Sequence, residues 1–348
     1  PQYSNAREGG NGSNSAIHAQ RNWVETVKVQ PRDAKGYTDL GFTAVQTARL
    51  DGIFRGRAAT VSLADKLPND VIYQAYARHF GSFDKGSSKQ QYPSSLMGSI
   101  ALIRQTLSDA AWYKEAQGKH TMQGAVEFNA ALAALGDIQN EGVVFEVSNE
   151  HSLLRATQVF SEFSVPLKVV GSGFEYARLD EVKKSGAELI VPLNFPAAPA
   201  MQGQFSELDV SLADLRHWER APGNPAALAN AGVRFAFTSH GLESSSDFWP
   251  NIRKAIAHGL APTQALAALT TIPADMAGVA DQVGRIQAGY RADFVVSQGD
   301  LFADGEIVSV WLQGEEKRLQ EMHPASFAGE YSLTLAGQDL TLKVADTS

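Results

Sequence analysis

The chain has 348 residues, which is enough to bury a large core in one big domain with a small appendage. Its formal net charge of −8 argues against a nucleic-acid partner, because phosphate binding requires a basic surface. No run of 18 apolar residues occurs, so no membrane span is expected, and the absence of cysteine excludes disulfides and thiolate metal sites.

The N-terminal residues 1–38 are polar and rich in Gly, Asn and Ser. The Gly-rich stretch 9–15 follows no apolar strand, so we interpret it as a surface loop and not as a phosphate cradle. Because the sequence begins at Pro1 and not at Met, we expect it to be a piece of a longer polypeptide, with an artificial end as the alternative.

Strand patterns alternate with helical patterns along most of the chain. The predicted strands cover residues 42–47, 59–63, 71–76, 143–147, 167–170, 188–193 and 233–238. The predicted helices cover residues 96–116, 122–135, 151–163, 176–185, 212–219, 225–231, 250–258 and 262–269. This alternation predicts an α/β fold with a parallel sheet, either open and doubly wound or closed as a (β/α)8 TIM-like barrel. Seven strands are one fewer than a closed barrel requires, so a barrel would lack its first strand in this chain.

After residue 279 the pattern changes to short antiparallel strands at 284–286, 292–297, 307–312 and 317–319. Two alternating segments around Gly337-Gln338-Asp339 then predict a terminal β-hairpin. We therefore predict a barrel domain at 1–278 and a small C-terminal β-sandwich portion with the terminal β-hairpin at 279–348.

The stretch from 256 to 296 carries a recognisable motif. It includes Ile-Ala-His-Gly-Leu-Ala-Pro at 256–262 and Gly-Arg-Ile-Gln-Ala-Gly-Tyr-Arg-Ala-Asp at 284–293. This motif resembles the C-terminal signature of the amidohydrolase superfamily, close to imidazolonepropionase-like and prolidase-like members. The resemblance covers roughly residues 140–320, and 40–140 more weakly. It implies a TIM barrel with a metal-dependent hydrolase site for carbon–nitrogen bonds, and a structural role for Asp293.

In that family a His-x-His strand, two later histidines and an aspartate hold the metal. This sequence contains no His-x-His, and the strand that should bear it would lie before Pro1. The two later histidine positions carry Glu146 and Ser172, and His240 stands in the place of the aspartate. This set falls short of the three protein ligands typical of catalytic zinc. The resemblance therefore indicates a degenerate member of the family, or a fragment of one.

Glu146, Ser172, Asn194 and His240 each follow a predicted parallel strand, so they should converge at one edge. Three interpretations stay open for Glu146, His240 and Ser172 as remnants of a catalytic site. The polar groups could satisfy one another by hydrogen bonds, Glu146 and His240 could act as a metal-free acid and base, or the pair could hold a weak metal with outside ligands.

We favour an amidohydrolase-like domain that has lost its metal site and acts as a scaffold or binding module, a pseudoenzyme that needs no cofactor. The alternative is a zinc-dependent hydrolase of carbon–nitrogen bonds, in non-peptide or dipeptide substrates, completed by residues outside this chain. Expected partners are a small-molecule ligand at the barrel mouth, and the remainder of a longer polypeptide or a second amidohydrolase-like domain. A secreted or periplasmic location is favoured over a cytoplasmic one.

Overall fold

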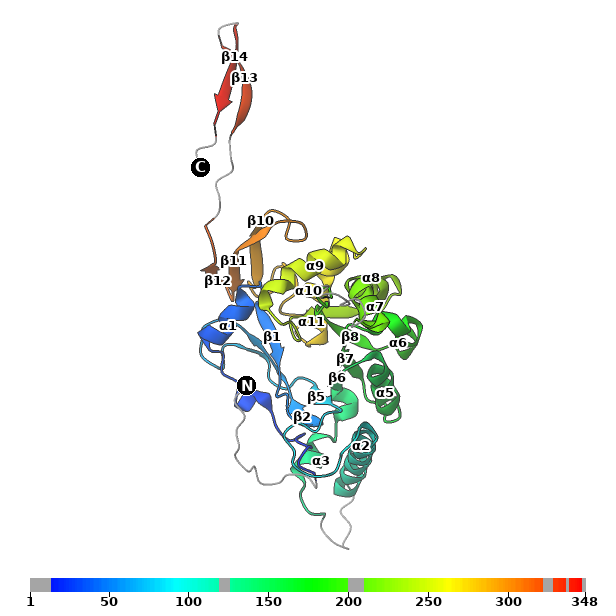
Figure 1. The fold of residues 1–348 in the computed structure, drawn as a ribbon. Helices are drawn as coiled ribbons and strands as arrows, with labels where there is room; N and C mark the ends of the chain where they lie inside the picture. The colour runs from blue at the N-terminus through cyan, green and yellow to red at the C-terminus, as the bar shows by residue number, and fades with distance from the viewer. Residues whose placement is uncertain (1–13, 119–125, 200–209, 322–327, 336–337, 346–348) are drawn as a thin grey trace.

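A computed structural model describes residues 14–118, 126–199, 210–321, 328–335 and 338–345 (Figure 1). Its largest sheet has six strands in the order β2-β5-β6-β7-β8-β9. These strands are β2 (Phe54–Arg57), β5 (His79–Ser82), β6 (Val143–Glu146), β7 (Leu167–Val170), β8 (Glu188–Pro192) and β9 (Phe235–Thr238). Strand β2 is antiparallel to β5, and all the other neighbours are parallel. The carboxyl ends of β5 to β9 therefore lie at one edge of the sheet.

The α/β fold is as the sequence predicts, but the strands that make up the main sheet are not all the predicted ones. No closed barrel forms among the residues that the structure describes, because β2 and β9 are the two ends of the main sheet. The predicted strands at 42–47, 59–63 and 71–76 instead form a separate antiparallel sheet of β1 (Ala44–Thr47), β3 (Ala59–Ser62) and β4 (Ile72–Gln74). Strands β2 and β5 were not predicted, because the Arg-Gly-Arg of β2 and the His-Phe-Gly-Ser of β5 interrupt any apolar run.

Helices follow the parallel strands and cover one side of the sheet, along which α2, α5, α6, α7 and α8 lie (Figure 1). The helices are α1 (Pro31–Thr38), α2 (Leu96–Gly118), α3 (Ala130–Ala134), α4 (Ile138–Glu141), α5 (Glu150–Ser161), α6 (Leu179–Ser185), α7 (Leu212–Arg220), α8 (Asn224–Asn230), α9 (Phe248–Ala257), α10 (Pro262–Leu269) and α11 (Thr271–Met276). Asn149 caps α5 by accepting a hydrogen bond from Ser152 N, which starts this helix directly after β6.

The predicted helix at 122–135 is shorter in the structure, where α3 begins at Ala130, and its residues 122–125 lie outside the described part. The predicted strand at 284–286 is a bend without strand pairing, and Gly284 in it has a φ of +89°. No helix of the described residues is long and apolar enough to cross a membrane.

The main core lies between the sheet and these helices. Phe145 of β6 packs edge-on against Phe160 of α5, with ring centroids 5.1 Å apart, and against Phe83 at 4.8 Å. Leu189 and Phe237 are buried in the same cluster. Burying each of these side chains contributes roughly 1.5–3 kcal/mol, which fixes the strands in register and aligns their ends.

Two three-stranded sheets share a second, smaller core. The sheet β10-β11-β12, of Phe294–Gln298, Glu306–Leu312 and Glu315–Arg318, places Val310 and Leu312 in one buried cluster with Leu63 and Val71. Asp293 joins the two sheets, because its carboxylate accepts a hydrogen bond from the hydroxyl of Tyr73 at 2.5 Å and from Gln313 N at 2.6 Å. The division of the chain at residues 278 and 279 stays a prediction, and this cluster contains residues from both sides of it.

The predicted terminal hairpin is confirmed as β13 (Gly329–Leu335) and β14 (Gln338–Val344), which pair in register. The hairpin stands away from the rest of the molecule (Figure 1). The predicted turn at Gly337 lies outside the described residues.

Candidate active site at the carboxyl edge of the sheet

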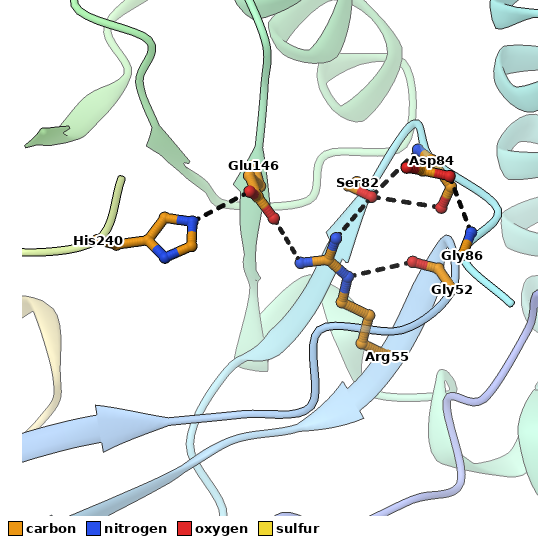
Figure 2. Close-up of polar contacts among 7 residues, drawn as sticks. All are labelled: Gly52, Arg55, Ser82, Asp84, Gly86, Glu146 and His240. Atoms are coloured by element: carbon orange, nitrogen blue, oxygen red, sulfur yellow. Dashed lines mark hydrogen bonds and ion pairs between the residues drawn. The ribbon is translucent and has the colours of Figure 1, made fainter. Parts of the chain in front are cut away.

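Glu146 and His240 meet at the carboxyl edge of the sheet. Glu146 is the last residue of β6, in register with Ser82 at the end of β5, and His240 follows β9 by two residues. The imidazole Nε2 of His240 lies 3.2 Å from Glu146 Oε1 (Figure 2). The Glu146 side chain is 33% exposed and that of His240 is 51% exposed, so the pair faces solvent on the imidazole side.

A third residue, Arg55 of β2, completes this cluster. Its guanidinium donates from Nη1 to Glu146 Oε2 at 2.7 Å, from Nη2 to Ser82 Oγ at 2.8 Å and from Nε to the carbonyl oxygen of Gly52 at 3.1 Å (Figure 2). The Arg55 side chain is only 5% exposed. A buried guanidinium needs a carboxylate and further acceptors, and this site supplies both.

The charges of the cluster shift the two titratable groups in opposite directions. The hydrogen bond from His240 and the contact with Arg55 outweigh partial burial and lower the pKa of Glu146 to about 2. The hydrogen bond with Glu146 raises the pKa of His240 above its ordinary value, against the opposing effect of burial. Glu146 is therefore a carboxylate across the physiological range. One of its oxygens binds the Arg55 guanidinium, and the other lies beside the His240 imidazole, whose protonated form this contact favours.

Ser172 lies at the end of β7 in a different hydrogen-bond network. Glu175, fully buried, accepts hydrogen bonds through Oε1 from the backbone N–H of Ser172 at 2.7 Å and of Gly173 at 3.1 Å. Its other oxygen accepts from Asn224 Nδ2 at 2.7 Å. A Cβ on Gly171 would lie 2.4 Å from Glu175 Oε1, so a side chain there would push the buried carboxylate out of its place. The polar contacts recorded for Ser172 are with Glu175 and Phe174, and none joins it to the Arg55–Glu146–His240 cluster.

Asn194, after β8, lies between the turns that follow β7 and β9. A Cβ on Gly173 would be 3.1 Å from Asn194 Oδ1, and a Cβ on Gly241 would be 4.0 Å from Asn194 Nδ2. Asn194 thus lies beside both the Ser172 turn and the residue after His240. The four expected residues share one edge of the sheet, but only Glu146 and His240 bond directly to each other among the recorded contacts.

The chain resembles known amidohydrolases in part of its sequence and in its fold. Residues 219–317 match the family model described as amidohydrolase family. The crystal structure of an amidohydrolase from Thermotoga maritima MSB8 has a TM-score of 0.69 at 18% identity, and the match covers 88% of this chain and 80% of that chain. The resemblance to the amidohydrolase superfamily is confirmed.

A curated relative, the amidohydrolase tasK of Hapsidospora irregularis, is 42% identical over 62 residues. These residues make up 18% of this chain and 6% of tasK. The match therefore spans a small part of a much longer amidohydrolase.

The strand ends of this amidohydrolase-like chain do not fit the metal that the family implies. Within the described residues, no group of three or more His, Asp or Glu side chains could hold a metal ion. Glu146 already binds a permanent cation through one oxygen and His240 through the other, and Ser172 is a weak neutral ligand. A divalent ion here would displace or oppose the Arg55 guanidinium, with a repulsion of several kcal/mol at close range.

Arg55 is the residue that sequence reasoning missed at this amidohydrolase-like edge. Its neighbours on β2 are Phe54 and Gly56, and Gly56 has a φ of +91°, in the region that favours glycine. An arginine directly after the apolar pair Ile53-Phe54 is the signal that could have identified it, because arginine is rarely buried without a carboxylate partner.

Proposed function

We propose that this chain is an amidohydrolase-like module whose metal-dependent site has been lost and which acts as a scaffold or binding module. The observation that carries the proposal is the buried guanidinium of Arg55, 2.7 Å from Glu146 Oε2. The guanidinium supplies, from within the protein, the positive charge that this edge would otherwise take from a metal. We also infer that the parallel strands β5 to β9 correspond to part of an amidohydrolase TIM barrel.

Charge balance supports this proposal. A carboxylate that is partly removed from water needs a compensating cation, and Glu146 has a buried one in Arg55, while its other oxygen lies 3.2 Å from the half-exposed imidazole of His240. Arginine is suited to this role because its guanidinium stays charged and forms several hydrogen bonds in one plane. The edge is thus stable without an ion, as a structural module requires.

The role of a scaffold or binding module is supported by the length of the curated relative, of which the match covers 6%. In this proposal the partner is the rest of a longer polypeptide, such as a second amidohydrolase-like domain, and a small molecule could bind beside the half-exposed His240. A secreted or periplasmic location is part of the same proposal.

To test this proposal, the purified chain is incubated with excess zinc and passed through gel filtration. Its zinc content is then measured by elemental mass spectrometry. We expect no stoichiometric zinc and no hydrolysis of amide, ester or cyclic imide substrates. Zinc bound at one equivalent, and lost in both Glu146→Gln and His240→Gln, would show that the metal site is intact. The matched control is His258→Gln, because His258 is exposed at the end of α9.

The alternative, a zinc-dependent hydrolase completed by residues outside this chain, is favoured by one observation. Glu146 and His240 remain adjacent, at 3.2 Å, and both are groups that zinc accepts as ligands. If it holds, a longer polypeptide that includes the preceding segment would bind zinc and hydrolyse carbon–nitrogen bonds, and His240→Ala would abolish both. A longer polypeptide without zinc would support the module.

A further inference from the structure

The terminal hairpin has one apolar face and one polar face. In the register of β13 and β14, Tyr331 pairs with Leu342 and Leu333 pairs with Leu340, and side chains alternate between faces along each strand. These four residues therefore lie on the same side, which we name the hairpin face. Each of them is between 45% and 55% exposed. On the opposite side, Ser332 pairs with Thr341 and Glu330 with Lys343.

This hairpin needs a surface to pack against. An isolated two-stranded hairpin is marginally stable in water, and three strands or a packed face are needed for independent stability. In the structure the hairpin lies away from the β10-β11-β12 sheet of its own chain (Figure 1). The four side chains offer roughly 350 Å² of exposed surface, which is less than half of the about 800 Å² per partner in a standard interface. A single contact of this size is too small to hold two molecules together.

A complementary apolar patch lies on the outer side of the sheet β10-β11-β12. Val295 and Val310 point into the buried cluster, so their neighbours Phe294, Val296 and Trp311 lie on the opposite side. The rings of Phe294 and Trp311 stack with centroids 5.3 Å apart and planes at 17°. All three side chains of this outer face are partly exposed. Two sheets that pack face to face in this way form an ordinary β-sandwich interface.

We propose that two copies of this chain form a dimer by exchanging hairpins, each hairpin face packing on the partner copy's outer face. A two-fold axis makes the contact twice, so the two hairpin faces contribute roughly 700 Å², and the partly exposed outer faces opposite them raise the total to about 1,000 Å², near the lower limit for a specific interface. The contact needs no group of the Arg55–Glu146–His240 cluster, so it is independent of the proposed function. The dimer should be weak and should dissociate on dilution.

The test is sedimentation and light scattering of the full chain over the micromolar range. We expect a concentration-dependent dimer, and Leu333→Lys with Leu342→Lys should raise its dissociation constant at least about tenfold. The matched control is Ser332→Lys with Thr341→Lys, on the polar face of the same two strands, which should leave the constant within about twofold.

A substitution on the acceptor side distinguishes the exchange from simpler contacts. Val296→Lys should weaken the dimer as the hairpin variant does, with circular dichroism confirming that both variants fold. A monomer at every concentration would overturn the proposal, as would a dimer that the hairpin variant leaves intact. A dimer sensitive to the hairpin variant but not to Val296→Lys would indicate a contact between two hairpins and would also overturn the exchange.

Discussion

The main sheet carries a cluster of the same three residue types, Arg, Glu and His, at its carboxyl edge and another at its amino edge, where strands β5 to β9 begin. At the carboxyl edge they are Arg55, Glu146 and His240, and at the amino edge they are Arg57, Glu141 and His79. The two arginines are separated on β2 by one glycine, and because β2 is antiparallel to β5, one reaches the end of β5 and the other its beginning.

The amino-edge cluster is the more enclosed of the two around its histidine. Arg57 binds Glu141 with two hydrogen bonds, at 3.0 Å from Nε and 2.7 Å from Nη2, and His79 Nε2 lies 3.0 Å from Glu141 Oε2. The His79 side chain is fully buried, whereas that of His240 is 51% exposed. Burial lowers the pKa of His79, and the carboxylate raises the pKa of His240. The two clusters thus contain the same residue types and differ in the exposure of the imidazole. A ligand can reach His240 at the carboxyl edge, whereas the buried His79 at the amino edge has a structural role.

The largest effect is expected from Glu141→Gln at the amino edge. The substitution leaves Arg57 without its charged partner and removes the carboxylate that lies 3.0 Å from the buried His79, so it should lower the free energy of unfolding by about 3 kcal/mol. Urea denaturation followed by circular dichroism measures this change. The control is Glu162→Gln, which removes the exposed partner of Arg104 and should cost under about 1 kcal/mol. Equal losses in the two variants would contradict the structural role of the amino edge.

A smaller loss, about 2 kcal/mol, is expected for Arg55→Met at the carboxyl edge. Methionine keeps the apolar length of the side chain but removes the donors to Glu146 and Ser82. Glu146 then keeps its contact with His240 and with water, so its charge is not left isolated. The same denaturation experiment measures the loss. A loss larger than that of Glu141→Gln would reverse the ranking of the two clusters.

The pH dependence of the two histidines should have opposite signs. His240 has a raised pKa in the folded protein, so its stabilising contribution is complete below pH 6.5 and is lost as the pH rises through the folded pKa. His79 has a lowered pKa, so its neutral form is favoured and the protein loses stability as the pH falls below 6.5.

Nuclear magnetic resonance of the imidazole protons tests this prediction directly. The signal that disappears in His240→Gln should titrate above pH 6.5, and the signal that disappears in His79→Gln should titrate below it or not at all. Loss of the His258 signal in His258→Gln serves as the assignment control. A His240 that titrates below pH 6.5 would mean that the Glu146 contact is not formed in solution.

Features of the fold that depend on a local sequence pattern could be predicted from the sequence. Strands β6 to β9 are short apolar runs followed by helical periodicity, so both their positions and the shared edge at Glu146 and His240 followed from local signals. Arg55 could not be placed in the same way, because its partners lie 27 and 91 residues further along the chain. Only the pairing of β2 with β5 brings them together, and the sequence of β2 lacks the apolar pattern of a buried strand.

Ser172 shows a different limit. Its position at a strand end was predicted, but its partner was not, because the turn between Gly171 and Gly173 aims the backbone amides at Glu175. The carboxylate of Glu175, only three residues away, binds this turn in preference to side chains on other strands, because closing a short loop costs little entropy.

The smallest effect is therefore expected for Ser172→Ala. The hydroxyl lies 3.5 Å from Glu175 Oε1 and accepts a long hydrogen bond of 3.4 Å from Phe174 N, while the backbone donors of residues 172 and 173 persist in the variant. Such long contacts contribute little, so the free energy of unfolding should change by under about 0.5 kcal/mol. Asn224→Ala, which leaves a buried oxygen of Glu175 without its donor, should cost about 2 kcal/mol. If Ser172→Ala instead shifted the titration of His240, Ser172 would belong to the carboxyl-edge cluster after all.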